Sequence, residues 1–248
     1  MTARLMFLAL ALSGCTAASA DPVLGGDALA LEGGSSAVPN LPAEADPFGR
    51  SMADWGERWW QWIYHIPAAQ NPFVTPDADC RVNQSGPVFF IPTVIDPGGA
   101  ASVDRSCTVP EGKALLVTPG ATLNDFPCPF PGFEPPAGVP LYDFLKDGIA
   151  AIVNSVNAID ITVDGVAVPV PFAHRTQSPH LFEVDGDASL QSVLDPCITG
   201  TPQPAYSDGY FVMLKPLAAG PHELVVHATD TKGTDVTVNW HLDVSGRH

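Results

Sequence analysis

The chain has 248 residues, of which 46% are hydrophobic, and its mean hydropathy is +0.14, so it is long enough to bury a substantial core. Charged residues make up only 15% of the sequence, which excludes a coiled coil and a charged disordered chain. The 27 acidic residues outnumber the 11 basic ones and give a net charge of −16. Because the basic residues are scattered, they form no patch that would neutralise phosphates, and nucleic acid is not an expected partner.

The first 20 residues have the pattern of an export signal. A single positive charge, at Arg4, precedes the apolar run LMFLALAL, which is too short for a membrane-spanning helix of about 20 residues. Two cleavage sites remain open. Leu-Ser-Gly-Cys at 12–15 matches the lipobox of bacterial lipoproteins and predicts a lipid on Cys15, whereas Ala-Ser-Ala at 18–20 matches an ordinary signal peptidase site. We favour the lipobox because all four of its positions fit.

Cysteine usage also indicates an exported chain. Either cleavage removes Cys15 from the pool of thiols and leaves four cysteines, an even number that predicts two disulfides. Three pairings are open, and we favour Cys80–Cys107 with Cys128–Cys197 because the first closes a short loop. The spacings lack any C-x-x-C pair, so we expect neither a zinc site nor another cofactor.

Residues 16–46 are rich in Ala, Gly, Ser and Pro and predict a flexible tether, followed by a single folded domain over residues 47–248. The first element of this domain is a helix from Met52 to His65, with Ser51 and Asp54 forming a capping box at its start. Its core-facing stripe contains Trp55, Trp59, Trp62, Ile63 and Ile66, and its opposite face contains Asp54, Glu57, Arg58, Gln61 and His65.

Trp60 and Tyr64 lie one helical turn apart on the flank of this stripe, which does not require them. Their rings are candidates for stacking against a sugar or another planar ligand, and Arg58 and Gln61 would add hydrogen bonds. The alternative is that both rings pack beneath a loop, such as the proline-rich segment 124–138, because aromatic residues on helices usually belong to a core.

Strand signals dominate the rest of the chain. The apolar run 87–95 is one, Pro110-Glu111-Gly112 predicts a hairpin turn, and Asp164-Gly165 predicts another. A second helix is expected over 141–156, and alternating residues from 236 to 244 predict a half-buried last strand. We therefore expect a mainly β fold: an antiparallel β-sandwich or jelly-roll-like domain with two accessory helices at one end or edge.

Several landmarks carry a resemblance to an uncharacterised family of exported prokaryotic proteins. They are the segments WGERWWQWIYHIPAAQNPF, QSGPVFFI, RSCTVPEGKALLVTP, NDFPC, DGYFVMLKPLAAGPHELVVHA and VTVNWHLDV, together with Cys80. The resemblance covers most of the chain after residue 54 and implies export, in some members as lipoproteins, and a shared β-rich fold. It implies no activity, substrate or catalytic residue.

The outward-facing residues of the last two strands are the main candidates for chemistry. Glu223 and His227 share one face of their strand, and Asn239, His241 and Asp243 share one face of the next. If the register aligns them, two imidazoles and two carboxylates converge and suit a metal or acid–base work. The alternative is a solvated polar face, which any alternating strand presents.

Two Asp-Gly loops offer oxygen ligands of the kind that calcium prefers. They are Asp185-Gly186-Asp187 and Asp208-Gly209, and neither has the spacing of an EF-hand. Ordinary turn chemistry explains both equally well.

The sequence therefore favours an exported, lipid-anchored envelope protein that acts as a non-enzymatic binding or structural module. Its expected partners are the membrane, through the lipid, and a carbohydrate or another ligand at the cell surface. The alternative is an exported hydrolase acting on polysaccharide, with acid–base residues among Asp185, Asp187, Glu223, His227, His241 and Asp243.

Overall fold

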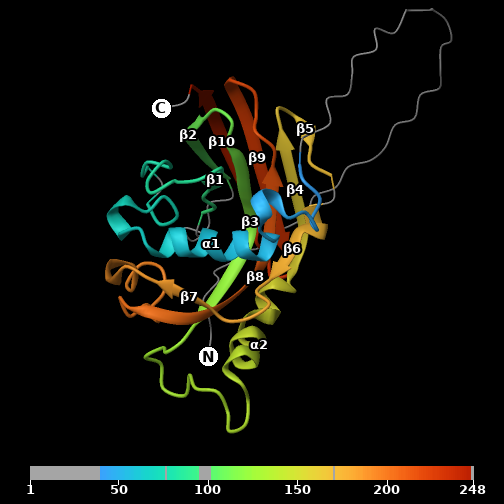
Figure 1. Cartoon of the computed structure of the whole chain (residues 1–248). Helices are drawn as coiled ribbons and strands as arrows, with labels where there is room; N and C mark the ends of the chain where they lie inside the picture. The colour runs from blue at the N-terminus through green and yellow to red at the C-terminus, as the bar shows by residue number, and fades with distance from the viewer. Residues whose placement is uncertain (1–39, 76, 95–101, 170, 247–248) are drawn as a thin grey trace, which may run out of the picture.

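The computed structural model describes residues 40–75, 77–94, 102–169 and 171–246 (Figure 1). The expected export signal, Cys15 and the tether up to residue 39 lie outside these residues. Within the described ranges, no helix has both the length and the hydrophobicity that crossing a membrane requires.

Two five-stranded sheets form the framework of the described chain. The first, sheet A, has the order β1-β3-β8-β6, and β7 also pairs with β8. Its strands are β1 (Val88–Ile91), β3 (Ala114–Asp125), β6 (Arg175–Gln177), β7 (Phe182–Asp185) and β8 (Pro202–Leu214). The second, sheet B, has the order β2-β10-β9-β4-β5. Its strands are β2 (Ser102–Pro110), β4 (Val156–Val163), β5 (Val166–Ala167), β9 (Gly220–Asp230) and β10 (Asp235–Ser245).

Two α-helices accompany the sheets, α1 (Met52–Tyr64) and α2 (Leu141–Val153). Four short 3-10 helices lie at Pro47–Gly49, Ala68–Gln70, Pro171–His174 and Ala188–Leu190 within the described residues. The expected mainly β, sandwich-like fold is confirmed, but the sheets are mixed. β1 pairs with β3 in parallel, and β2 pairs with β10 in parallel.

The predicted hairpin around Pro110-Glu111-Gly112 is wrong. The turn itself forms, with φ of 82° at Gly112. However, β2 pairs with β10 in sheet B while β3 pairs with β1 and β8 in sheet A, so the turn carries the chain from one sheet to the other. By contrast, the Asp164-Gly165 hairpin is confirmed, because β4 and β5 pair across it and both turn residues have positive φ.

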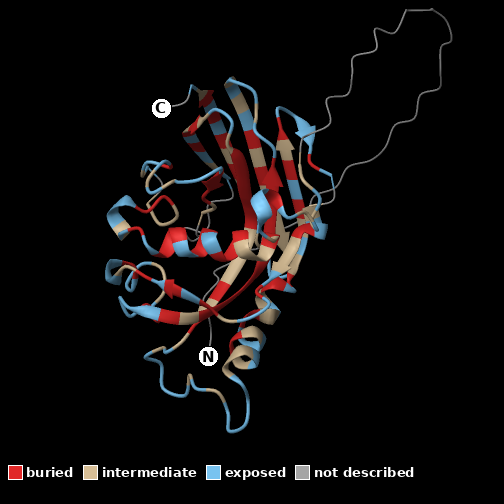
Figure 2. Ribbon diagram, in the orientation of Figure 1, coloured by how far each residue is buried: buried red, intermediate tan, exposed pale blue. Residues whose placement is uncertain are grey.

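The space between the two sheets holds the largest hydrophobic cluster. Sheet A contributes residues such as Phe89, Leu115 and Val212, and sheet B contributes Leu224, Trp240 and others. The last strand alternates as expected, with Val238, Trp240, Leu242 and Val244 buried and His241 and Asp243 exposed (Figure 2). Sheet B therefore keeps one face towards the core and one towards solvent.

Helix α1 covers the other face of sheet A, which corrects the expectation that both helices cap an end or an edge (Figure 1). Because the middle of sheet A is covered on both faces, its strands include continuous apolar runs there, and all four residues of β1 are buried. The predicted capping box at Ser51 and Asp54 is present. The helix approaches the sheet closely at Gly56, where an added Cβ would lie 2.9 Å from the ring of Phe211.

Helix α2 packs against one end of sheet A, where Leu145 and Ile149 form a small cluster with Tyr206 of β8. It ends three residues earlier than expected, because Val156 already belongs to β4. The chain meets sheet A before residue 47: Asn40 forms an isolated bridge with Leu214, and the amide of Leu41 donates to the carbonyl of Met213 at 2.8 Å. Residues 40–46, which we expected in the tether, are thus part of the described fold.

Candidate functional site

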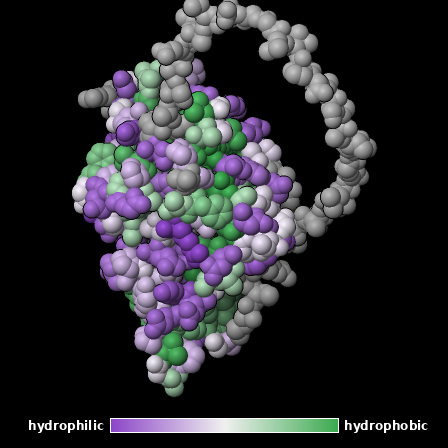
Figure 3. All heavy atoms as spheres, turned by 90° about the vertical axis from the view of Figure 1, so that its right-hand side faces the viewer, coloured by the Kyte–Doolittle hydropathy of each residue, from purple (hydrophilic) through white to green (hydrophobic). Residues whose placement is uncertain are grey.

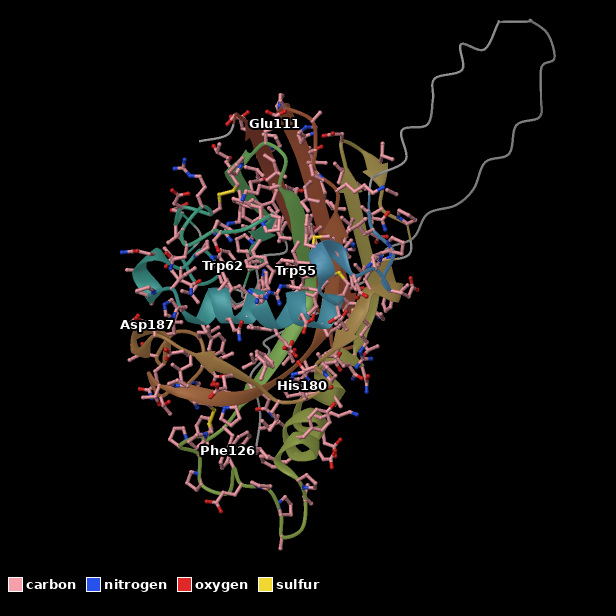
Figure 4. The ribbon with its side chains drawn as sticks, in the orientation of Figure 1. Trp55, Trp62, Glu111, Phe126, His180 and Asp187 are labelled. Carbon is pink, nitrogen blue, oxygen red and sulfur yellow. A yellow bond between two sulfur atoms is a disulfide. The ribbon has the colours of Figure 1, made fainter. Side chains whose placement is uncertain are left out.

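The aromatic pair on α1 is part of the core and not an exposed ledge. Trp60 is 5% exposed and Tyr64 is 2% exposed, so the expectation that they stack against a ligand is wrong. Their rings contact each other edge to face, with centroids 5.9 Å apart. Arg58 and Gln61 are exposed, and the side chain of Gln61 donates to the carbonyl of Glu183 at 2.9 Å. Figure 4 shows Trp55 and Trp62 on the same helix.

Glu57 is another correction on this helix. We expected it on the solvent face, but it is only 8% exposed. Burial raises the pKa of its carboxyl, and a hydrogen bond with Ser178 partly opposes this rise.

The two candidate histidines of sheet B lie at separate positions. His241 lies directly opposite Glu223 in the β9–β10 ladder, whereas His227 lies opposite Thr237. His227 instead contacts two carboxylates, Asp235 at 2.9 Å and Asp160 at 3.4 Å. The predicted convergence of both imidazoles is therefore wrong, because four residues of an extended strand separate the two positions by about 13 Å.

One end of sheet B does carry a cavity, with a volume of about 700 Å³. Three of the predicted residues line it: Glu223, His241 and Asp243. The other lining residues come from the loop 77–81, from Ser106, Cys107 and Thr108 of β2, and from Asp164, Pro221, His222 and Leu242. The cavity thus combines the loop with three strands and the β4–β5 turn, and His227, Asp185 and Asp187 are not among its lining residues.

Acidic groups dominate the chemistry of this cavity. Its carboxylates belong to Asp77, Asp79, Asp164, Glu223 and Asp243. Arg81 is the guanidinium among the lining residues, and it forms an ion pair with Asp79 at 2.9 Å. The cavity therefore has an excess of negative charge, which suits a cationic ligand.

His222 and Asp164 form a second pair at the cavity, with Nδ1 of the imidazole 2.7 Å from Oδ2 of the carboxylate. Partial burial acts to lower the pKa of His222, but its bonds with Asp164 and the carbonyl of Ala218 outweigh this and raise it. Partial burial acts to raise the pKa of Asp164, but bonds with His222 and the amide of Glu223 lower it. The pair is thus favoured in its doubly charged form.

A disulfide fastens the cavity loop to sheet B. The predicted pairing is confirmed for both bridges, Cys80–Cys107 and Cys128–Cys197. The first joins the loop 77–81 to β2, and both of its cysteines line the cavity. Asp77 and Asp79 were not identified as site residues from the sequence. The segment Asp-Ala-Asp-Cys-Arg, with three charged residues next to a cysteine expected in a disulfide, is the signal that could have identified them.

The two Asp-Gly segments differ from the expected pair of loops: Asp208-Gly209 lies inside strand β8, so the second expected loop is wrong, and Asp185 is the last residue of β7. Asp187 caps a short 3-10 helix by accepting from the amide of Ser189 at 2.9 Å. Asp208 is 1% exposed and forms an ion pair with Arg175 at 2.6 Å. Figure 4 shows Asp187 well away from Glu111, which follows β2 at the end of sheet B that carries the cavity. The helix cap formed by Asp187 and the ion pair formed by Asp208 therefore account for these two carboxylates without calcium.

Figure 3 looks onto the side of the molecule that carries β4, β5 and β6, where purple hydrophilic residues lie among green hydrophobic ones.

Neither the protein-family models nor the curated proteins contain a match to this chain. The two disulfides indicate an oxidising location outside the cytoplasm.

Proposed function

We propose that this chain is an exported, lipid-anchored envelope protein, and that it acts as a binding module for a cationic ligand. The observation that carries the proposal is the acidic cavity at the end of sheet B. Five carboxylates line it, and they come from the loop 77–81, the β4–β5 turn and the strands β9 and β10. Asp79 and Asp164 are already paired with Arg81 and His222, but the five carboxylates together still leave an excess of negative charge that a bound cation would compensate.

The lining favours a cationic group over a stacked sugar. Carbohydrate sites commonly present an aromatic ring to the sugar, but no Trp, Tyr or Phe is among the described residues that line this cavity. The net charge of −16 adds a long-range attraction for cations to the local one. The ligand class that fits is an amine or guanidinium group of a cell-surface molecule.

One observation favours a second function, hydrolysis of polysaccharide. Glu223 lies directly opposite His241, and Asp243 is two residues further along the same strand, so a carboxylate and an imidazole face the same cavity. Such a pair suits general acid–base catalysis. The wide excess of carboxylates makes binding of a cation the stronger proposal.

A pair of variants separates the two functions. The double variant Glu223→Gln with Asp243→Asn removes two cavity charges, and Asp160→Asn removes one on the same sheet outside the cavity. With a fluorescent oligolysine peptide as probe, we expect the double variant to bind about 5- to 30-fold more weakly at low salt, and Asp160→Asn to bind normally. Absence of oligolysine binding, with cleavage of a labelled polysaccharide that depends on Glu223, would instead establish the hydrolase.

Lipid attachment at Cys15 needs a separate experiment, because this residue lies outside the described residues. If Cys15 carries the lipid, Cys15→Ala releases the protein from the membrane fraction into the soluble one. Unchanged membrane association of Cys15→Ala would contradict lipid attachment at this residue.

A further inference from the structure

Asp125, the last residue of β3, has a carboxylate with an unusual environment. The residue is 0% exposed, and neither carboxylate oxygen has a hydrogen-bond partner elsewhere in the described part of the chain. A buried charge without a partner costs several kcal/mol in general, so such a group is rare unless something neutralises it.

The nearest acidic group is Asp195, from the loop that follows β7. The ligand atoms of Asp125, Asp195 and Cys197 all lie within 4.8 Å of one another. Asp195 is held in place on both oxygens: it accepts from the amide of Cys197 at 2.8 Å and from the hydroxyl of Tyr64 at 3.4 Å. The disulfide Cys128–Cys197 ties the same loop to the segment that follows Asp125.

The two carboxylates reinforce each other's unfavourable charge. Asp125 is fully buried and Asp195 is partly buried, so water screens little of the repulsion between them. The pair therefore requires either a proton or a cation.

The positions of the two carboxylates allow one cation to bind both of them. Two oxygens bound to one calcium ion, each at about 2.3–2.6 Å, can lie up to about 5 Å apart. The ligand atoms of Asp125 and Asp195 lie within 4.8 Å of each other, which meets this limit.

We propose that Asp125 and Asp195 bind a divalent cation of the oxygen-preferring class, with calcium as the best fit. Cys197 is not a ligand, because its sulfur is in the disulfide with Cys128 and offers no thiolate, which also argues against zinc. The ion would join the end of β3 to the loop 191–200, and water or backbone carbonyls would complete its shell. This site is separate from the acidic cavity on sheet B and does not depend on the function proposed for it.

The test uses the purified protein after treatment with a chelator. We expect calcium to bind with a stoichiometry of one ion per chain at this site by calorimetry. At a concentration about 100-fold above the Kd, the Tm should rise by roughly 5–10 °C. Asp125→Asn and Asp195→Asn should abolish this rise, while Asp147→Asn, which removes an exposed carboxylate on α2, should keep it.

If Asp125→Asn does not fold, Asp195→Asn still tests the proposal. Asp195 is less buried, and an asparagine at this position keeps the oxygen that accepts from the amide of Cys197. A rise in Tm that survives both substitutions would place the ion elsewhere and overturn the proposal. An unchanged Tm of the unmodified protein, with Asp125→Asn more stable than it, would show that Asp125 is held as the neutral acid, and this too would overturn it.

Discussion

The indole N–H of Trp60 donates to the hydroxyl of Ser207 at 2.8 Å and so joins helix α1 to the central strand β8 of sheet A. Both residues are buried, at 5% and 3% exposure. A tryptophan in this position is a packing and hydrogen-bonding contact between two layers of the fold, which is why it offers no surface to a ligand.

Replacing Trp60 with Phe should lower the free energy of unfolding by about 1–3 kcal/mol, because the Ser207 hydroxyl loses its donor and the smaller ring leaves space. Urea denaturation measures this loss. In a double-mutant cycle with Ser207→Ala, the two losses should be clearly less than additive. Phe172→Leu, at a residue that is 43% exposed, is the control and should change little. Full additivity of Trp60→Phe and Ser207→Ala would contradict a direct contact.

Some features of helix α1 could be predicted from the sequence, and the burial of its flank could not. Its start, its capping box and its apolar stripe follow from local rules, and the structure has all three. The burial of Trp60 and Tyr64 does not follow from them. It depends on Phe182, Leu190 and Ile198, which come from much later in the chain and pack in the same cluster as the helix. Periodicity identifies the most apolar face of a helix, but not a second layer that covers its flank.

Gly56→Ala should destabilise the protein, although alanine favours a helix over glycine by about 1 kcal/mol. The added methyl group would lie 2.9 Å from the ring of Phe211, and helix and sheet would have to move apart. We expect a loss of about 1–3 kcal/mol in urea denaturation. Gly148→Ala on α2 is the comparison, because its closest neighbour is the end of the Asn124 side chain, and its loss should be smaller. A gain in stability for Gly56→Ala would show that α1 sits further from the sheet.

Removing the bridge at the cavity with Cys80→Ser and Cys107→Ser should cost about 2–5 kcal/mol of stability. Because this bridge holds the loop 77–81 on β2, hydrogen exchange should increase in that loop. The matched variant, Cys128→Ser with Cys197→Ser, should lose stability without increasing exchange in the loop 77–81. Equal exchange in the two variants would mean that the loop is held by other contacts.

The candidate site could be predicted only in part. Alternation along the last two strands places Glu223, His241 and Asp243 on an outer face, and the structure agrees. The pairing of Cys80 with Cys107 was predicted, but the contribution of Asp77 and Asp79 to the cavity also depends on where β2 lies. The sequence suggested that β2 pairs with β3, whereas the turn at Gly112 joins two different sheets. Local turn signals identify a reversal of the chain but not the sheet that each strand joins.

Asp164→Asn should make stability less dependent on pH. The raised pKa of His222 stabilises the fold below its ordinary value of about 6.5, and this contribution is lost as the pH rises through the folded-state pKa. The lowered pKa of Asp164 stabilises the fold above about pH 4, and this contribution is lost as the pH falls through its folded-state pKa. Both contributions are therefore present between about pH 4 and 6.5.

Asparagine suits this substitution, because it tolerates the positive φ of 52° at position 164 and keeps an oxygen for the amide of Glu223. Asp164 is about half exposed, so solvent screening limits the expected loss to roughly 0.5–1 kcal/mol at pH 5, and it should shrink towards pH 8. Urea denaturation at the two pH values measures it, and NMR titration should show a lower pKa for His222 in the variant. His227, which contacts Asp160 and Asp235 instead, should titrate as before. Equal losses at pH 5 and pH 8 would mean that the charge on His222 does not contribute to the pair.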